Sequence, residues 1–255
     1  AKPCQRGRIN IMVRKNMSGK GTAVIVGVGP GLGAALCRRF AREGMNVAAA
    51  ARDAAKTEKI VAEVNAEGGG EARSLSIDTT DEAAVEKLFN DVSGDWGVPD
   101  ATIYNAGAFM KTSILEAQAA DFKRCWEANC YGGFLVGRAA ARRMTPRGSG
   151  SILFTGATAS KRGSAQFFNL SVGKFGLLAL AQAMARELGP QGIHVAHVII
   201  DGQINAGRHA RLAAERQPDA LLEPDHIAET YWQLHTQHRS SWAFDADLRP
   251  WVEKF

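Results

Sequence analysis

Short apolar runs alternate with helix-like segments along most of this chain. The short runs are typical of buried strands, whereas the longer segments repeat their apolar residues every three or four positions, as amphipathic helices do. Strands joined through helices run parallel, because a parallel connection needs a crossover rather than a hairpin. The sequence therefore predicts an α/β fold: one doubly wound parallel sheet with helices on both faces.

The expected strands occupy short stretches of the sequence: 22–26, 46–51, 72–77, 100–104, 151–155, 194–200 and a last one near 242–248. The expected helices lie between and after them: about 31–43, a segment ending at Gly68, a segment around 85–92, 115–144, 165–188, 206–216 and 224–235. The ligand site of such a sheet lies beyond the carboxyl ends of its strands, where the strand order reverses.

The excess of basic charge is confined to the N-terminus. Residues 1–16 hold basic side chains and no acid, and they account for the whole net charge of +5. We expect a poorly ordered extension there, with a transit peptide as the alternative, and a single domain over residues 17–255. The balanced remainder has no basic patch interleaved with aromatics, which argues against a nucleic-acid partner. No apolar run approaches the ~20 residues that span a bilayer, so we expect no membrane segment.

The cysteines and histidines show no metal-binding pattern. None of the four cysteines forms a CxxC pair, which is typical of reduced thiols in a cytoplasmic protein. His194 and His197 are three residues apart in a strand-like run and are therefore expected to face opposite sides of the sheet. We expect no metal ion.

A glycine-rich turn lies between the first expected strand and the first expected helix, where residues 27–33 read GVGPGLG. Gly27 permits a tight turn, Gly31 lets the backbone approach a pyrophosphate, and Gly33 lets the helix pack closely. Gly29 and Leu32 complete this predicted cofactor-binding turn, and the helix N-terminus offers N–H groups to the phosphates. The turn predicts dinucleotide binding; an ordinary tight turn is the alternative.

The end of the second expected strand distinguishes the two nicotinamide dinucleotides. An Asp or Glu there would bind the ribose 2′-hydroxyl and repel a 2′-phosphate. Here Ala51 leaves space and Arg52 can pair with a 2′-phosphate, whereas Asp53 is expected to cap the next helix. Asp78, at the end of the third strand, either accepts from the adenine amino group or caps the helix beginning near Asp81. We therefore expect NADP(H) rather than NAD(H).

Further motifs follow the glycine turn in order: Asp78, the triplet Asn105-Ala106-Gly107, Asn129 and Lys174. In order and spacing they resemble the short-chain dehydrogenase/reductase family, over about residues 20–204. The resemblance implies a Rossmann-type subunit of about seven strands and a homo-oligomer, a dimer or tetramer built on the two long helices. It also implies that Asn105, Ala106 and Gly107 contact the dinucleotide, and that hydride passes between NAD(P)(H) and a carbonyl or alcohol.

The catalytic set of that family is only partly present. The family uses a Tyr that gives or takes the proton, a Lys four residues later that holds the nicotinamide ribose, a Ser thirteen residues before the Tyr, and an Asn that holds a relay water. By this resemblance Lys174 and Asn129 are the retained catalytic positions. Leu170 stands at the Tyr position and Ala157 at the Ser position, and neither side chain donates a hydrogen bond.

Two functions fit a chain that retains Lys174 and Asn129 but lacks the family's Tyr and Ser. The first is an NADP(H)-dependent oxidoreductase with a non-standard proton donor, whose substrate no motif names. The alternative is a catalytically silent dinucleotide-binding protein that acts as a sensor or partner subunit. Asp201 is one candidate donor if burial raises its pKa, although it is equally placed to cap the loop after the sixth strand. Thr158, Ser160 and Ser171 are the other candidates.

Apolar side chains gather near the missing tyrosine, on the segment that carries Phe167, Phe168, Leu170 and Phe175. They predict an apolar pocket above the nicotinamide and therefore an apolar small-molecule partner.

Overall fold

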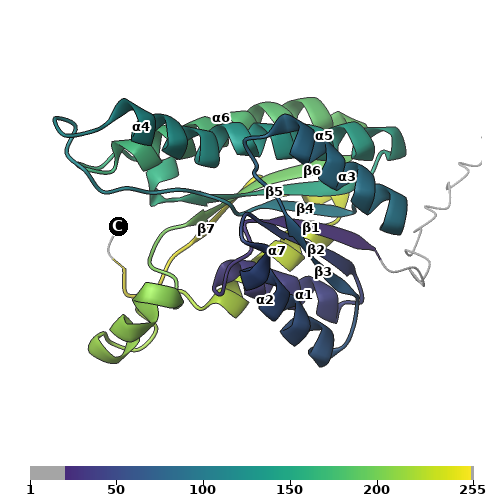
Figure 1. The fold of residues 1–255 in the computed structure, drawn as a ribbon, viewed down its shortest axis with the longest axis horizontal. Helices are drawn as coiled ribbons and strands as arrows, with labels where there is room; N and C mark the ends of the chain where they lie inside the picture. Colours follow the sequence, from purple (N-terminus) through teal and green to yellow (C-terminus); the bar gives the residue numbers. More distant parts are fainter. Residues whose placement is uncertain (1–20, 254–255) are drawn as a thin grey trace, which may run out of the picture.

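Seven parallel strands form one sheet in the computed structural model, which describes residues 21–253 (Figure 1). The sheet order is β3-β2-β1-β4-β5-β6-β7, and the predicted doubly wound α/β fold is confirmed. The strands are β1 Thr22–Val26, β2 Asn46–Ala51, β3 Ala72–Ser76, β4 Ala101–Tyr104, β5 Gly150–Ala157, β6 Ile193–Ile200 and β7 Asp245–Leu248. The basic segment 1–16, with the prediction about its order, lies outside the described residues.

Helices cover both faces of the sheet: α1 Leu32–Arg42, α2 Ala54–Glu67, α3 Glu82–Trp96, α4 Ala119–Trp126, α5 Gly132–Met144, α6 Phe168–Leu188 and α7 Pro224–Thr236. Figure 1 shows α3, α4, α5 and α6 on one face and α1, α2 and α7 on the other. Alternate side chains of β1 supply two cores, because Ala23 and Ile25 pack with α1 and α7 whereas Val24 and Val26 pack with α3 and α5. His194 and His197 likewise face opposite sides, as predicted, since His194 bonds to Leu234 of α7 and His197 approaches Ser160.

The helix expected over 115–144 begins later and is interrupted. Leu115 lies in the preceding loop with 92% of its surface exposed, and α4 begins only at Ala119. Between α4 and α5 the chain forms a π-helix over Glu127–Tyr131. Such wide turns occur often at functional sites, and this one carries the buried Asn129.

Three other boundaries differ from the sequence expectation for local reasons. The helix expected from residue 165 begins at Phe168, because Gln166 has a φ of 67°, outside the helical region. The segment Gly207–Glu215 is a 3₁₀-helix that projects from the body at the lower left of Figure 1. The last strand begins at Asp245, because Trp242 instead stacks on His194 with ring centroids 4.9 Å apart.

Residues 168–191 are long and apolar enough to cross a membrane by length and composition alone, so the expectation that no segment reaches this length is wrong. In the fold this segment packs on the sheet. Leu177 and Ala181 are buried in the core, and Lys174 bonds to β5. These are the contacts of a helix that covers a parallel sheet.

Candidate functional site

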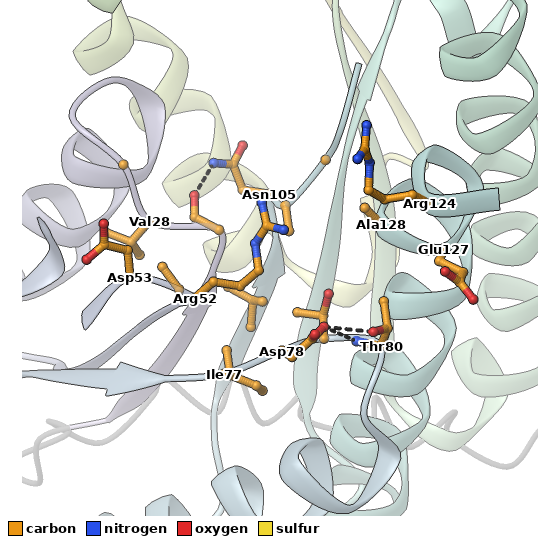
Figure 2. A pocket seen from close by; sticks show the side chains of 17 residues that line it. Val28, Arg52, Asp53, Ile77, Asp78, Thr80, Asn105, Arg124, Glu127 and Ala128 are labelled. Carbon is orange, nitrogen blue, oxygen red and sulfur yellow. Dashed lines mark hydrogen bonds between the residues drawn. The ribbon is translucent and has the colours of Figure 1, made fainter. Parts of the chain in front are cut away.

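A cavity of about 490 Å³ lies at the carboxyl ends of β1 to β4, where the strand order reverses (Figure 2). Seven of the predicted cofactor residues line it: Gly27, Gly29, Arg52, Asp78, Asn105, Ala106 and Gly107. The other four predicted cofactor residues do not line it: Gly31, Leu32, Gly33 and Lys174. Asn129, predicted as a catalytic residue, does not line it either. The cavity therefore gathers side chains and backbone from five separate segments at the place that the fold predicts.

The glycine turn is held tightly against its neighbours. The backbone N–H of Gly27 donates to the Ala50 carbonyl at 2.8 Å, and the Asn105 side-chain amide donates to the Gly27 carbonyl at 2.9 Å. Gly27 has a φ of 93°, and a Cβ atom there would lie 2.3 Å from the Ala106 nitrogen. Only glycine satisfies both the left-handed conformation and this close approach.

The other glycines of the turn make contacts that differ from those expected. A Cβ atom on Gly33 would lie 2.6 Å from Val28 Cα, so Gly33 makes room for the turn itself rather than for the sheet. A Cβ atom on Gly31 would lie 2.7 Å from Ala206 Cβ, in the segment after β6. Gly29 has no neighbour within 4 Å of such an atom and leaves the backbone open toward the cavity.

The ends of β2 and β3 supply opposite charges to the cavity. Figure 2 shows the Arg52 side chain extending into it, above Asp78. The Asp78 carboxylate accepts from the Thr80 backbone N–H at 2.9 Å and from the Thr80 hydroxyl at 2.8 Å, and these bonds hold its pKa below the usual value. Asp53 caps α2 through the Lys56 N–H, as predicted.

Asp81, not Asp78, caps α3, so the capping alternative for Asp78 is wrong. Asp78 instead lines the cavity, and its Oδ1 atom accepts a hydrogen bond from the Thr80 hydroxyl.

Lys174 and Asn129 lie just beyond the loop after β4. A Cβ atom on Gly107 would lie 2.8 Å from Asn129 Oδ1 and 3.8 Å from Lys174 Nζ, which places both polar atoms against this loop. The Lys174 ammonium donates to the Thr155 carbonyl at 2.7 Å, and burial lowers its pKa to about 8. The Asn129 amide donates to the carbonyl of Ala108 at 2.6 Å, while its buried Oδ1 has no protein partner.

The orphaned Asn129 oxygen and the Lys174 ammonium fit a hydroxyl-bearing ligand that reaches past Gly107. Buried polar atoms without partners are rare in folded proteins and are satisfied by water or a ligand. The ribose of a dinucleotide whose other half fills the cavity carries hydroxyls of this kind. The residues present therefore fit a nicotinamide dinucleotide.

Two of the three tyrosine hydroxyls are hydrogen-bonded within the protein, and none of the three tyrosines stands four residues before Lys174. Tyr104 donates to the Ala128 carbonyl at 2.6 Å, and Tyr231 shares a 2.6 Å hydrogen bond with the Thr155 hydroxyl on the α7 face of the sheet. Tyr131 stacks on Trp126 with ring centroids 6.0 Å apart. Leu170 lies in the first turn of α6, four residues before Lys174, and Ala157 ends β5.

Asp201 does not have the raised pKa expected of a buried acid. Burial raises its pKa, but hydrogen bonds from Thr158 and from Arg249 lower it, and the pKa lies below its usual value. The Arg249 Nε atom donates to Asp201 Oδ2 at 2.8 Å. Asp201 is therefore an ionised, paired carboxylate, and its predicted role as a proton donor at neutral pH is corrected.

Two of the aromatic side chains near Leu170 pack against other aromatic rings. Phe167 stacks on Phe109 with ring centroids 5.1 Å apart, and Phe168 stacks on Phe122 at 6.1 Å. Phe175 keeps 44% of its surface exposed. None of these rings lines the cavity at β1 to β4, and the apolar pocket expected above the nicotinamide stays a prediction.

Several cavity residues were not anticipated from the sequence: Thr79, Thr80, Arg124, Glu127 and Ala128. Thr79 and Thr80 directly follow Asp78 in the sequence, and this position at a strand end could have predicted that they line the cavity. Arg124, Glu127 and Ala128 are spaced i, i+3 and i+4, which places them on one face of the helical turns around the start of the π-helix. That spacing was the signal available for them.

Residues 21–253 contain no group of three or more His, Cys, Asp or Glu side chains arranged to hold a metal ion. Cys37, Cys125 and Cys130 are free thiols, and burial raises the pKa of Cys37 to about 12. Cys4 lies outside the described residues.

Residues 21–216 match the short chain dehydrogenase family, and the chain belongs to this family. It is 31% identical to sorbitol-6-phosphate 2-dehydrogenase of Escherichia coli over 82% of each chain. It resembles the crystal structure of a short-chain dehydrogenase from Rhodopseudomonas palustris, with 38% identity, a TM-score of 0.79 and coverage of 91% of this chain and 99% of the other. A metagenomic short-chain oxidoreductase in complex with NADP is 26% identical, with a TM-score of 0.79 over 92% of this chain and 99% of the other.

Membership of this family identifies the chain as a nucleotide-binding, oxidoreductase-type protein with a Rossmann-type fold. The cofactor, the proton donor and the substrate are separate questions, because one fold serves many reactions.

Proposed function

We propose that this protein is an NADP(H)-dependent oxidoreductase that interconverts a hydroxyl and a carbonyl group on a small molecule. The observation that carries the choice of cofactor is the pair Ala51 and Arg52 at the end of β2. Ala51 is small, and Arg52 is exposed and extends its guanidinium into the cavity above Asp78. A guanidinium pairs with a phosphate through two parallel hydrogen bonds, which a ribose hydroxyl does not offer.

The proposed placement of the dinucleotide follows the cavity from β3 to β4. The adenine lies near Asp78, the 2′-phosphate at Arg52, and the pyrophosphate at the glycine turn, where Gly31, Leu32 and Gly33 open α1. Asn105, Ala106 and Gly107 then lead to Lys174, which binds the nicotinamide ribose, and to Asn129, which holds a relay water beside it. When bound, the nicotinamide supplies the hydride donor or acceptor of the reaction.

The proton chemistry in this proposal is non-standard. Lys174 and Asn129 remain on the cofactor side, whereas Leu170 and Ala157 replace the tyrosine and serine that the family uses on the substrate side. A hydride transfer that forms or consumes an alcohol must still move one proton, so another polar group has to do so. A catalytically silent sensor or partner subunit is the competing proposal, and turnover distinguishes the two.

The test separates binding from turnover. NADPH and NADH are titrated against the protein by fluorescence, and a panel of alcohols, ketones and aldehydes is then screened for reduction or oxidation of the cofactor. We expect tighter binding of NADPH and turnover of part of the panel. Tight binding with no turnover across a broad panel supports the silent protein instead, and no binding of either dinucleotide contradicts both proposals.

We also propose that the protein is a cytoplasmic homo-oligomer, a dimer or tetramer that pairs through α4 and α6. Trp126 on α4 and Val172 and Phe175 on α6 expose 37%, 46% and 44% of their surfaces. Exposed apolar side chains on adjacent helices are typical of subunit interfaces. Light scattering coupled to size exclusion tests this, and a monomer at micromolar concentration contradicts it.

A further inference from the structure

A second cavity, of about 170 Å³, lies at the carboxyl ends of β5, β6 and β7. These strands follow β4 in the sheet, so the second cavity is next along the edge that carries the dinucleotide cavity. Its wall includes Thr158 after β5, Asp201 after β6 and Arg249 after β7. In the proposed placement the nicotinamide ribose lies at Lys174, whose ammonium donates to the Thr155 carbonyl of β5 at 2.7 Å, three residues before Thr158.

A chain of hydrogen bonds joins these three side chains. The Thr158 hydroxyl donates to Asp201 Oδ1, and Arg249 donates to Asp201 Oδ2 through both Nε, at 2.8 Å, and Nη2. The backbone N–H of Asp201 donates to the Leu248 carbonyl at 2.8 Å. The carboxylate is thus fixed on both oxygens, and the side chains of Asp201 and Arg249 are only 17% and 19% exposed.

These bonds fix the direction in which the Thr158 hydroxyl donates its hydrogen bond. Its proton is directed to Asp201, so the oxygen presents lone pairs to the cavity that it lines. Lone pairs accept a hydrogen bond from a hydroxyl group, but they cannot bond to a carbonyl oxygen, because that oxygen is also an acceptor. Thr158 directly follows Ala157, the residue at which the family resemblance places the substrate-side hydroxyl.

We propose that Thr158 binds the hydroxyl of an alcohol substrate and passes the proton released on oxidation to Asp201. This inference rests on the proposed function, because it requires an oxidised nicotinamide dinucleotide as hydride acceptor. Thr158 is the catalytic residue, since it contacts the substrate. Asp201 and Arg249 are positioning residues that act through Thr158.

Oxidation of the alcohol breaks two bonds to hydrogen. The C–H bond at the alcohol carbon breaks, and its hydride reduces the oxidised nicotinamide. The substrate O–H bond breaks as the C=O double bond forms, and that proton moves to Thr158 Oγ1 while the Thr158 proton moves to Asp201 Oδ1. The hydrogen bonds from Thr158 and Arg249 hold the pKa of Asp201 below its usual value, so the carboxylate is ionised at neutral pH and has an oxygen available for this proton.

Other charged groups surround this relay and set its pH response. Arg162 lies near Asp201 and, like Arg249, lowers its pKa. Lys161 and Asp247 pair at 2.8 Å in the same cavity wall, which also includes Glu253. The wall of this second cavity is therefore mostly polar and ionic.

A pair of substitutions at one position tests the relay. Thr158→Val keeps the shape of the side chain and removes the hydroxyl, whereas Thr158→Ser keeps the hydroxyl. With an alcohol that the wild type oxidises, we expect Thr158→Val to lose roughly 100-fold or more in kcat, and Thr158→Ser to retain activity within about fivefold. Asp201→Asn should lose as much as Thr158→Val. Asp91→Asn, which removes an exposed carboxylate paired with Lys87 on α3 and lies outside both cavities, is the control and should stay within about threefold of wild type.

Two readouts separate a relay from a structural role. The affinity for NADPH, measured by fluorescence, should be unchanged in all four variants, because none of the substituted residues lines the dinucleotide cavity. The pKa of Asp201, followed by carboxyl carbon NMR, should rise in Thr158→Val and not in Thr158→Ser. The wild-type kcat should fall at acid pH as Asp201 is protonated, and Asp201→Asn should show no such dependence.

The outcomes also distinguish the two proposals. Wild-type protein that binds NADPH but oxidises no alcohol contradicts the proposed function and the relay together. Wild-type protein that oxidises an alcohol, with Thr158→Val equally active, contradicts the relay alone. Thr158→Ser as inactive as Thr158→Val also overturns the relay, because the hydroxyl would then not be the feature that matters.

Discussion

Gly27 lies directly against the backbone of Ala106, so that a Cβ atom at position 27 would come within 2.3 Å of the Ala106 nitrogen. This contact joins the end of β1 to the loop after β4 and fixes one wall of the dinucleotide cavity. It also predicts which glycine of the turn tolerates a side chain.

We expect Gly27→Ala to destabilise the fold by about 2 kcal/mol or more, since the new methyl group meets backbone and the φ of 93° is unfavourable for alanine. Gly29→Ala is the matched control, because a methyl group there would have no neighbouring atom within 4 Å. Urea unfolding monitored by circular dichroism measures both variants. Equal stability of the two would contradict the close approach of Gly27 to Ala106.

Arg52→Ala should weaken NADPH binding by about 1–3 kcal/mol, the cost of losing a charged hydrogen-bonding partner. NADH has no 2′-phosphate, so its affinity should change little. Fluorescence titration of both dinucleotides gives the comparison, and Arg42→Ala, which removes an exposed guanidinium paired with Glu67 on the surface, is the control. A similar loss for NADPH and NADH would show that Arg52 does not select the 2′-phosphate.

The double substitution Leu170→Tyr and Ala157→Ser should create or raise carbonyl reductase activity. Leu170 lies one helical turn before Lys174, whose buried ammonium is in place to lower the pKa of a neighbouring phenol. The rate of NADPH oxidation with a panel of ketones measures the effect, with each single substitution as the control. No gain in the double variant, with NADPH affinity retained, would argue against assigning these positions from the family resemblance.

His197 should make the protein sensitive to acid. Burial, followed by repulsion from Lys174 and Lys161, lowers the pKa of His197 from 6.5 to about 4. Between these pH values the unfolded chain binds a proton that the folded chain does not, so stability is complete above pH 6.5 and falls as the pH drops toward 4. The expected loss is on the order of 3 kcal/mol.

The test compares the pH dependence of the free energy of unfolding, not its absolute value. His197→Gln should flatten the decrease below pH 6.5, whereas His226→Gln, at an exposed position, should leave it unchanged. Identical slopes in wild type and His197→Gln would mean that the imidazole titrates normally in the folded protein.

The fold was predictable because periodicity and glycine placement specify most of it. The runs that form β1, β2 and β5 are apolar, and the stop at Gly68 ends α2. The predicted ends of helices and strands were wrong where contacts between distant segments determine them. The π-helix at Glu127–Tyr131 arises within a continuous helical pattern, and Trp242 leaves the strand pattern to stack on His194.

The candidate site was predictable on the cofactor side and not on the substrate side. Arg52 and Asp78 follow strand ends, and topology alone brings strand ends together. The meeting of Thr158, Asp201 and Arg249 depends on β7 pairing with β6, which no local spacing in the sequence specifies. The pKa of Asp201 could not be assigned correctly without knowing that Arg249 lies beside it.

The two cavities are completed by different stretches of the chain. The lining of the dinucleotide cavity ends at Ala128, in the first part of the described chain, whereas the second cavity needs Arg249 after the last strand. Because synthesis proceeds from the N-terminus, every component of the first cavity leaves the ribosome long before the residue that neutralises Asp201. A nascent or C-terminally truncated chain would therefore carry every residue that lines the first cavity while Asp201 still lacked its guanidinium.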